Sequence, residues 1–266
     1  MKKSVALLAL ICSTASFAHE PFLTPSAYIT ENKQIPVLAS YTEEMLIPEY
    51  AMKDVKSFQM IDPKQNKHEL ETSMIKSATF ANLELKEQGT YTVSTRANYP
   101  LKYVYHDKKW KKLYDTPADK AKPLAERDYM IPSDFKKAPQ TVDVTRHWLI
   151  QSFVTKEKIS DVQTVADYPL NVTFTQHPNQ LKANQSVTLT VTQDKQPILS
   201  QVEVHTKGTS HQKALLESQT NALGQVNITF PKAGEYVITV HQPFDENSKH
   251  KPTDQHYVIT TVQVTE

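Results

Sequence analysis

Cysteine and glycine are the residues this sequence has least of. Its only cysteine, Cys12, lies in an amino-terminal segment that we expect to be removed, and the whole chain holds four glycines. Without cysteine the remaining chain can form neither a disulfide nor a thiolate metal site, so metal ligands must come from His, Asp, Glu or an amine. So few glycines leave little room for a phosphate-binding loop, and no Gly-x-Ser-x-Gly nucleophile motif occurs.

A strong net charge and a second long apolar run are also missing. The formal charge is +1, so no basic face is implied and we expect no nucleic-acid partner. No apolar stretch beyond the first eighteen residues approaches the length of a membrane helix, so the mature chain is not expected to span a membrane. The carboxylates are spread along the chain rather than paired at a spacing typical of an acid/base couple. We therefore expect that the protein has no catalytic residues and is not an enzyme.

The amino terminus has the pattern of an export signal. Lys2 and Lys3 precede a short apolar run over residues 5–11, and small residues follow at Ser16 and Ala18. Cleavage after Ala18 would remove residues 1–18 as a signal peptide and leave His19 as the first residue. Ile11 before Cys12 argues against a lipoprotein signal. The expected location is the periplasm.

Composition favours β-structure, since Val, Thr, Tyr, Phe and Ile are plentiful and no long stretch has helical periodicity. We predict an all-β fold of two β-sandwich domains, residues 19–167 and 168–266. In the second, immunoglobulin-like or transthyretin-like domain, strands are expected at 170–176, 186–193, 198–206, 214–220, 225–230, 235–242 and 255–264. In the first they are expected at 27–30, 35–39, 56–62, 67–72, 78–85, 90–96, 102–106, 110–113 and 141–155. Residues 116–140 are expected to form a long loop.

Histidine is the residue type that carries a functional prediction. After cleavage His19 would hold a free α-amine beside its imidazole, and two nitrogens on one residue can chelate a metal. His241 ends one expected strand and His256 begins the next, so we expect their imidazoles at one edge of the sandwich. The predicted metal ligands are His19, His241 and His256, with Glu20 as a possible oxygen ligand.

The other histidines have simpler explanations. His147, beside Trp148 on an apolar strand, is expected to be packed. His177, in the sequence His177-Pro178-Asn179, is expected to make a structural hydrogen bond at a turn. His205 and His211 form a weaker second cluster on a polar face.

Four short motifs resemble a known periplasmic family of unknown function, whose members are commonly described as nickel or cobalt uptake components. The motifs are Ala18-His19-Glu20-Pro21-Phe22-Leu23-Thr24-Pro25, Gly89-Thr90-Tyr91, His177-Pro178-Asn179 and Thr220-Asn221-Ala222-Leu223-Gly224-Gln225-Val226. The resemblance implies two β-rich domains and an accessory role in metal uptake. His19 matches the first mature residue of the family, and His241 matches a histidine after the penultimate strand. Pro21-Phe22 replaces the family's usual aromatic pair, which changes the surroundings of His19.

Our first hypothesis is a non-catalytic protein that binds a divalent transition metal, Ni²⁺, Co²⁺, Zn²⁺ or Cu²⁺, and delivers it to a membrane uptake system. These borderline metals accept imidazole and amine nitrogen. The alternative is a β-sandwich interaction module that binds a glycan or a protein partner, with incidental histidines. A copper oxidase of the histidine-brace type is a third hypothesis.

Overall fold

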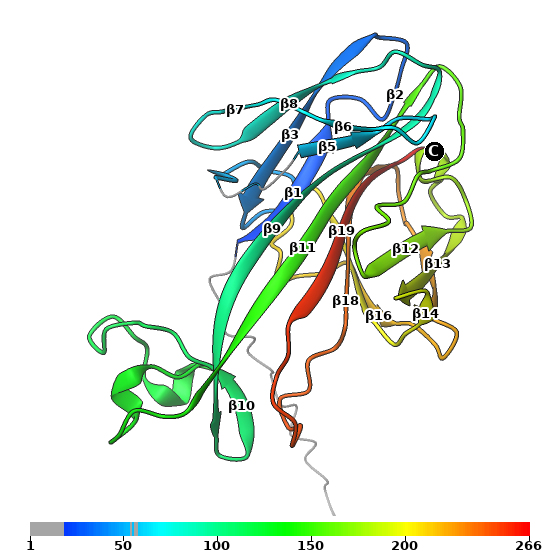
Figure 1. Ribbon diagram of the computed structural model, residues 1–266. Helices are drawn as coiled ribbons and strands as arrows, with labels where there is room; N and C mark the ends of the chain where they lie inside the picture. Colours follow the sequence, from blue (N-terminus) through cyan, green and yellow to red (C-terminus); the bar gives the residue numbers. More distant parts are fainter. Residues whose placement is uncertain (1–18, 54, 56–57) are drawn as a thin grey trace, which may run out of the picture.

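The chain folds almost entirely into β-structure. The structure is a computed structural model that describes residues 19–53, 55 and 58–266, so the expected signal peptide, Cys12 included, lies outside the described residues. Within them every regular element is a strand or a short 3-10 turn (Figure 1). The prediction of an all-β fold is confirmed. No helix in the described part of the chain is long and apolar enough to cross a membrane.

The strands form three sheets. A first outer sheet contains β1 (Glu20–Pro25), β3 (Gln34–Thr42), β4 (Tyr50–Ala51), β7 (Thr72–Met74) and β8 (Thr79–Glu84). A central sheet contains β2 (Ile29–Thr30), β5 (Phe58–Ile61), β6 (Lys67–Glu69), β9 (Gly89–His106), β10 (Lys109–Lys112), β11 (Thr141–Lys156), β15 (Gln201–Thr206), β16 (Leu216–Gln219), β18 (Gly234–His241) and β19 (Gln255–Val264). A second outer sheet contains β12 (Leu170–Phe174), β13 (Ser186–Gln193), β14 (Gln196–Pro197) and β17 (Gln225–Thr229).

The central sheet is covered on both faces, so the protein is a sandwich of three layers. Successive residues of a strand point to opposite faces, and β18 illustrates the result. Val237 packs with the first outer sheet in one core, whereas Tyr236 and Ile238 pack with the second outer sheet in another. In Figure 1 the long strands β9, β11 and β19 run diagonally between the two outer sheets. Burial of these two apolar faces is the main source of stability.

Both halves of the chain contribute to the central sheet. Strands β9 and β11 from the first half continue through β19 to β18 and β15 from the second. Within the central sheet the halves are joined by the parallel pairing of β11 with β19, in which Arg146 lies opposite Gln255 and Ser152 opposite Thr261. The two expected sandwiches therefore share their middle layer across the boundary predicted at residues 167 and 168.

All seven strands expected in the second half are present, whereas the first half departs from the prediction, most clearly at β1 and β9. Strand β1 was missed because Pro21 and Pro25 break its pattern. It lies at the edge of the first outer sheet, where proline is tolerated. Strand β9 is one element of 18 residues where two shorter strands were expected around Pro100. Thr145 lies opposite Pro100 and donates its N–H to the side chain of Asp254 rather than to β9, so this pair makes no ladder hydrogen bond that Pro100 would remove.

Beyond the sandwich, β9, β10 and the start of β11 extend into an arm, seen at the lower left of Figure 1. The arm has a small core of its own around Tyr103, Trp110 and Val144. Residues 116–140, expected as a long loop, follow β10 and contain the turns η1 (Leu124–Glu126) and η2 (Pro132–Asp134). A third turn, η3 (Pro178–Gln180), lies against β11 and β19 in the sandwich.

Candidate functional site

The register of β1 places His19 and Glu20 at one end of the sandwich. In the antiparallel pair of β1 with β3, Glu20 lies opposite Thr42. One residue further along this register, His19 faces Glu43, and its Nε2 lies 3.5 Å from Oε1 of Glu43. The edge of the His19 ring also meets the ring of Tyr50 at 4.6 Å between centroids. The residue expected to begin the mature chain is therefore held in place by the fold.

A turn of the second half docks on the same point. The backbone of residues 43–45 bonds to residues 208–211, including the N–H of His211, which donates to the carbonyl of Glu43 at 3.0 Å. The Nδ1 of His211 lies 3.1 Å from the same carbonyl. This second histidine is thereby placed beside Glu43, although it lies far from it in the sequence.

Glu20 is a half-buried residue, and one of its carboxyl oxygens is buried without a hydrogen-bond partner in the described part of the chain. Its Oε2 has almost no solvent exposure and no partner among the described residues. Burial raises the pKa of Glu20, and the nearby charges of Arg146, His211 and His241 oppose that rise, whereas Glu203 adds to it. Strand β1 packs against β11 and β19, which brings Glu20 near charged side chains of the central sheet.

Three side chains on the facing surface of the central sheet form a histidine–carboxylate–histidine row. Glu203 and His205 are two residues apart on β15 and so share a face, and His241 lies on the neighbouring strand opposite Gln201. The Nε2 atoms of His205 and His241 lie 3.6 and 3.5 Å from the two oxygens of Glu203. Hydrogen bonds from both histidines lower the pKa of Glu203 to about 2, against the effect of burial. His205 itself is 1% exposed.

Aromatic and cationic side chains border this row. The ring of Tyr257 stacks on His241, with centroids 4.6 Å apart, and the guanidinium of Arg146 lies over Tyr257 at 4.8 Å from its centroid. Burial raises the pKa of Tyr257, so its hydroxyl stays protonated. We call the group formed by His19, Glu20, Glu43, Glu203, His205, His211 and His241 the amino-terminal cluster.

His256 lies outside the amino-terminal cluster, and the expectation that it would share an edge with His241 is wrong. His241 pairs with Tyr257 across β18 and β19, so the preceding residue, His256, points to the opposite face of the sheet. There its ring stacks on His147, with centroids 5.0 Å apart. Burial and the neighbouring His147 both lower the pKa of His256. Asp254 lies beside the pair, 3.3 Å from Nε2 of His147.

The amino-terminal cluster has unfilled bonding capacity, but it is not a complete metal site. Nε2 of His19, Oε2 of Glu20 and Nδ1 of His205 are all buried without a hydrogen-bond partner among the described residues. Imidazole nitrogen and carboxylate oxygen suit a borderline divalent metal. No three His, Asp or Glu side chains in residues 19–53, 55 and 58–266 lie close enough together to hold a metal ion. A site here needs a further ligand.

The sequence identified some of this cluster and missed some. His19, Glu20 and His241 come together at one end of the sandwich, and His205 and His211, expected as a separate weaker cluster, join them. Glu43 and Glu203 were missed as partners. The spacing of Glu203 and His205 on a strand was the available signal, because residues two apart share a face.

His177 has the structural role expected for it. Its Nε2 lies 3.0 Å from the hydroxyl of Thr90 and 3.1 Å from the carbonyl of Ser160, and its Nδ1 accepts a hydrogen bond from the N–H of Asn179. The Asn179 amide in turn donates to the carbonyls of Tyr28 and Phe153. This motif therefore joins η3 to β9 and β11.

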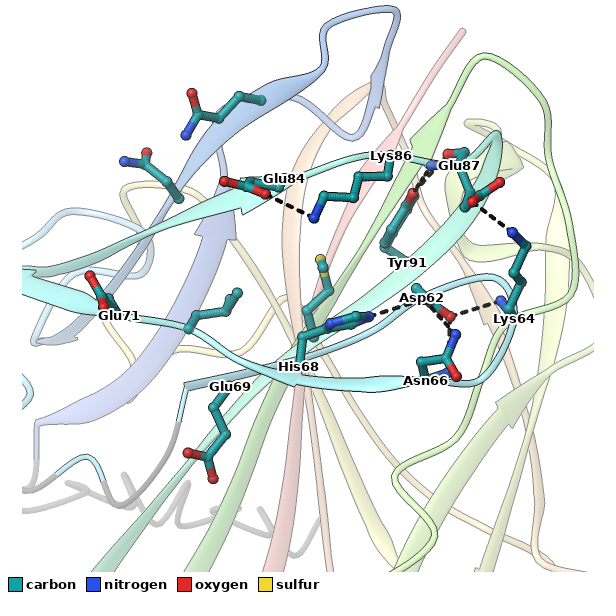
Figure 2. A pocket seen from close by; sticks show the side chains of 14 residues that line it. Asp62, Lys64, Asn66, His68, Glu69, Glu71, Glu84, Lys86, Glu87 and Tyr91 are labelled. Carbon is teal, nitrogen blue, oxygen red and sulfur yellow. Dashed lines mark hydrogen bonds and ion pairs between the residues drawn. The ribbon is translucent and has the colours of Figure 1, made fainter.

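A separate groove of about 490 Å³ opens between the β5–β6 hairpin and β8 (Figure 2). Many of its polar side chains are bonded to one another. Asp62 contacts His68 at 3.0 Å, Lys64 contacts Glu87 at 2.6 Å, and Lys86 contacts Glu84 at 3.3 Å. Against the effect of burial, hydrogen bonds from His68, from the side chain and backbone of Asn66 and from the N–H of Lys64 lower the pKa of Asp62 to about 2, all of them within one hairpin. The amino-terminal cluster is the stronger candidate because it contains buried groups without partners.

Comparison with known proteins gives a family but no activity. The family described as "Domain of unknown function (DUF4198)" matches residues 16–243. Among solved structures, the D0-D1 domain of intimin matches with 10% sequence identity over 92% of this chain and 97% of that one, at a TM-score of 0.23. A likeness at that TM-score carries no argument. No curated protein matches.

Proposed function

Because this chain belongs to the DUF4198 family, whose function is unknown, we propose a role from the chemistry of its amino-terminal cluster. The protein is a non-catalytic, periplasmic binding protein for a divalent transition metal, and it serves an uptake system in the membrane. Its metal site is completed when cleavage after Ala18 frees the α-amine of His19. The nickel or cobalt uptake role implied by the resemblance in the sequence is consistent with this chemistry.

One observation carries the proposal. The residues that follow the expected cleavage point are built into the fold, with His19 and Glu20 both half-buried and His19 against Glu43 and Tyr50. A mature amino terminus is ordinarily a mobile tail. Here the new amine would form within a group of four histidines and three carboxylates.

The α-amine of His19 also supplies the further metal ligand that the described side chains lack. The imidazole and amine of His19 would form a chelate, and Glu20 or Glu43 and His241 are the nearest candidates for the remaining positions. Glu203 would then act as an outer partner that orients His241, as carboxylates do for metal-bound histidines. Nitrogen and oxygen donors without thiolate suit Ni²⁺, Co²⁺, Zn²⁺ or Cu²⁺ and allow the metal to be released to a transporter.

The test is calorimetric titration of four tag-free proteins with each of these metals. The first begins at His19, the second has one additional alanine before His19, and the other two carry His241→Gln or His256→Gln in the first background. His256 is a matched control because it lies on the adjacent strand but on the opposite face of the sheet. We expect stoichiometric binding by the first protein and at least a tenfold loss of affinity in the extended chain and in His241→Gln. We expect no change in His256→Gln.

Each contrary result has a definite meaning. Equal affinity in the first two proteins would exclude the α-amine as a ligand. Equal losses in the two histidine variants would mean that the amino-terminal cluster does not form the site. No binding by the first protein would refute the metal-binding function and favour the alternative interaction module, in which the histidines are incidental.

A further inference from the structure

Two cationic side chains lie beside the proposed metal site. The ring of Tyr257 contacts both His241 and Arg146. It stacks on His241 with centroids 4.6 Å apart, and the Arg146 guanidinium lies 4.8 Å from its centre. Lys112, half-buried on β10, lies close enough that Arg146 lowers its pKa while Glu20 raises it; burial is the largest cause of its lowered pKa. Lys112 lies opposite Tyr103 and Arg146 lies opposite Tyr99, so both cations are on the same face of the central sheet.

Arg146 lowers the pKa of Glu20 more than any other neighbouring charge does, but the two make no direct ion pair. The Nε of Arg146 is buried without a hydrogen-bond partner among the described residues. Tyr257 offers the face of a ring and leaves the planar N–H donors of the guanidinium available. Such a group binds a carboxylate through two parallel hydrogen bonds.

A bare divalent cation would be repelled by these two charges, whereas an anionic metal complex would be attracted to them. We propose that Arg146 and Lys112 form an anion subsite beside the metal ligands, and that the protein binds its metal together with a small carboxylate that coordinates it. The carboxylate reaches the guanidinium of Arg146, while the metal is held by the amino-terminal cluster. This inference rests on the proposed function and adds the chemical form of the ligand.

The test is equilibrium dialysis of the protein that begins at His19 with radiolabelled citrate or radiolabelled L-histidine, each with and without one equivalent of Ni²⁺. We expect at least one carboxylate to be retained, and only when Ni²⁺ is present. Arg146→Gln should reduce that retention at least tenfold, and Arg146→Lys, which keeps the charge but not the planar fork, should reduce it less. Arg96→Gln is the matched control because Arg96 pairs with Asp167 and contacts Tyr168, away from the cluster. It should retain the carboxylate as the parent protein does.

The outcomes separate this inference from the proposed function. Retention of Ni²⁺ without either carboxylate, or equal carboxylate retention in the parent protein and both Arg146 variants, overturns the anion subsite and leaves metal binding intact. Retention of neither Ni²⁺ nor carboxylate by the parent protein overturns both. If Arg146→Gln fails to fold, carboxylate retention by Arg146→Lys still tests the anion subsite.

Discussion

The imidazole of His241 stacks on the ring of Tyr257, with centroids 4.6 Å apart and planes inclined by 22°. The two residues lie opposite each other in the β18–β19 pair, so both point toward the first outer sheet. This relationship orients the candidate site. The ring of Tyr257 contacts both His241 and Arg146. Because Tyr257 lies opposite His241, the preceding residue, His256, points to the other face of the central sheet.

The first prediction concerns pH and Glu203. The pKa of Glu203 is about 2 in the folded protein against an ordinary value of 4.5, because His205 and His241 stabilise its ionised form. The unfolded chain therefore binds a proton more readily than the folded one between these values. The contribution is fully present above about pH 4.5 and is lost as the pH falls toward 2. After allowance for its partial exposure, we expect a loss on the order of 2 kcal/mol in the free energy of unfolding.

Urea unfolding of the parent protein and of Glu203→Gln between pH 2.5 and 6 measures this effect. The variant should be less stable at pH 6, and its difference from the parent should shrink as the pH falls. Glu217→Gln is the control, because Glu217 lies opposite Glu203 on β16 but is exposed. A difference between parent and Glu203→Gln that stays constant over this range would contradict the prediction.

The second prediction concerns Gly224, which closes the turn that begins at Asn221. Gly224 has φ of +70°, and a Cβ added to it would lie 2.3 Å from the carbonyl oxygen of Val191. Gly208 has a similar φ of +75°, but a Cβ there would meet nothing within 4 Å. Gly208→Ala should therefore lose only the left-handed backbone term, about 1 kcal/mol. Gly224→Ala adds a clash with rigid backbone and should lose about 3 kcal/mol or more.

Thermal and chemical unfolding of the two alanine variants compare these costs directly. Equal losses would show that the backbone around Val191 yields to the added methyl group. The comparison holds the backbone conformation nearly constant, so the difference reports the steric contact alone.

The third prediction concerns the arm. The side chain of Arg127 is 3% exposed and pairs with Asp134, and it also donates to the carbonyls of Lys122 and Tyr129. Arg127→Ala leaves Asp134 buried without its cation, which costs about 3–5 kcal/mol for a buried pair. Because residues 113–140 lie outside the two large cores, we expect that cost to appear as local opening of the arm.

Hydrogen–deuterium exchange with mass spectrometry locates the change. Backbone amides of residues 122–135 should exchange faster in Arg127→Ala, while those of β18 and β19 should keep the parent rate. Arg96→Ala is the control, since its partner Asp167 is half exposed and such pairs contribute about 0–1 kcal/mol. Faster exchange in β18 and β19 would mean that the arm unfolds together with the sandwich.

Strand alternation is local, and for that reason much of the fold could be predicted. The stretch Val187-Thr188-Leu189-Thr190-Val191 alternates apolar and polar residues, and it forms the middle of β13. Asn221 and Gly224 carry the chemistry of a turn within four residues, and the structure has a turn there. Strand β1 was missed because edge position, which makes its prolines harmless, depends on neighbours distant in sequence.

The sequence by itself determined the β class, the expected amino-terminal histidine and the residue types available as ligands, because composition and short-range pattern contain that information. Only the tertiary structure decided that both halves share one central sheet and that Glu43, Glu203 and His211 join His19, Glu20 and His241. Pairing of β11 with β19 joins residues more than a hundred positions apart, and its register sets the face of every side chain. A shift of one residue in the β18–β19 pairing would put His256 in place of Tyr257 opposite His241. The composition of the site is therefore a consequence of register, which local sequence does not specify.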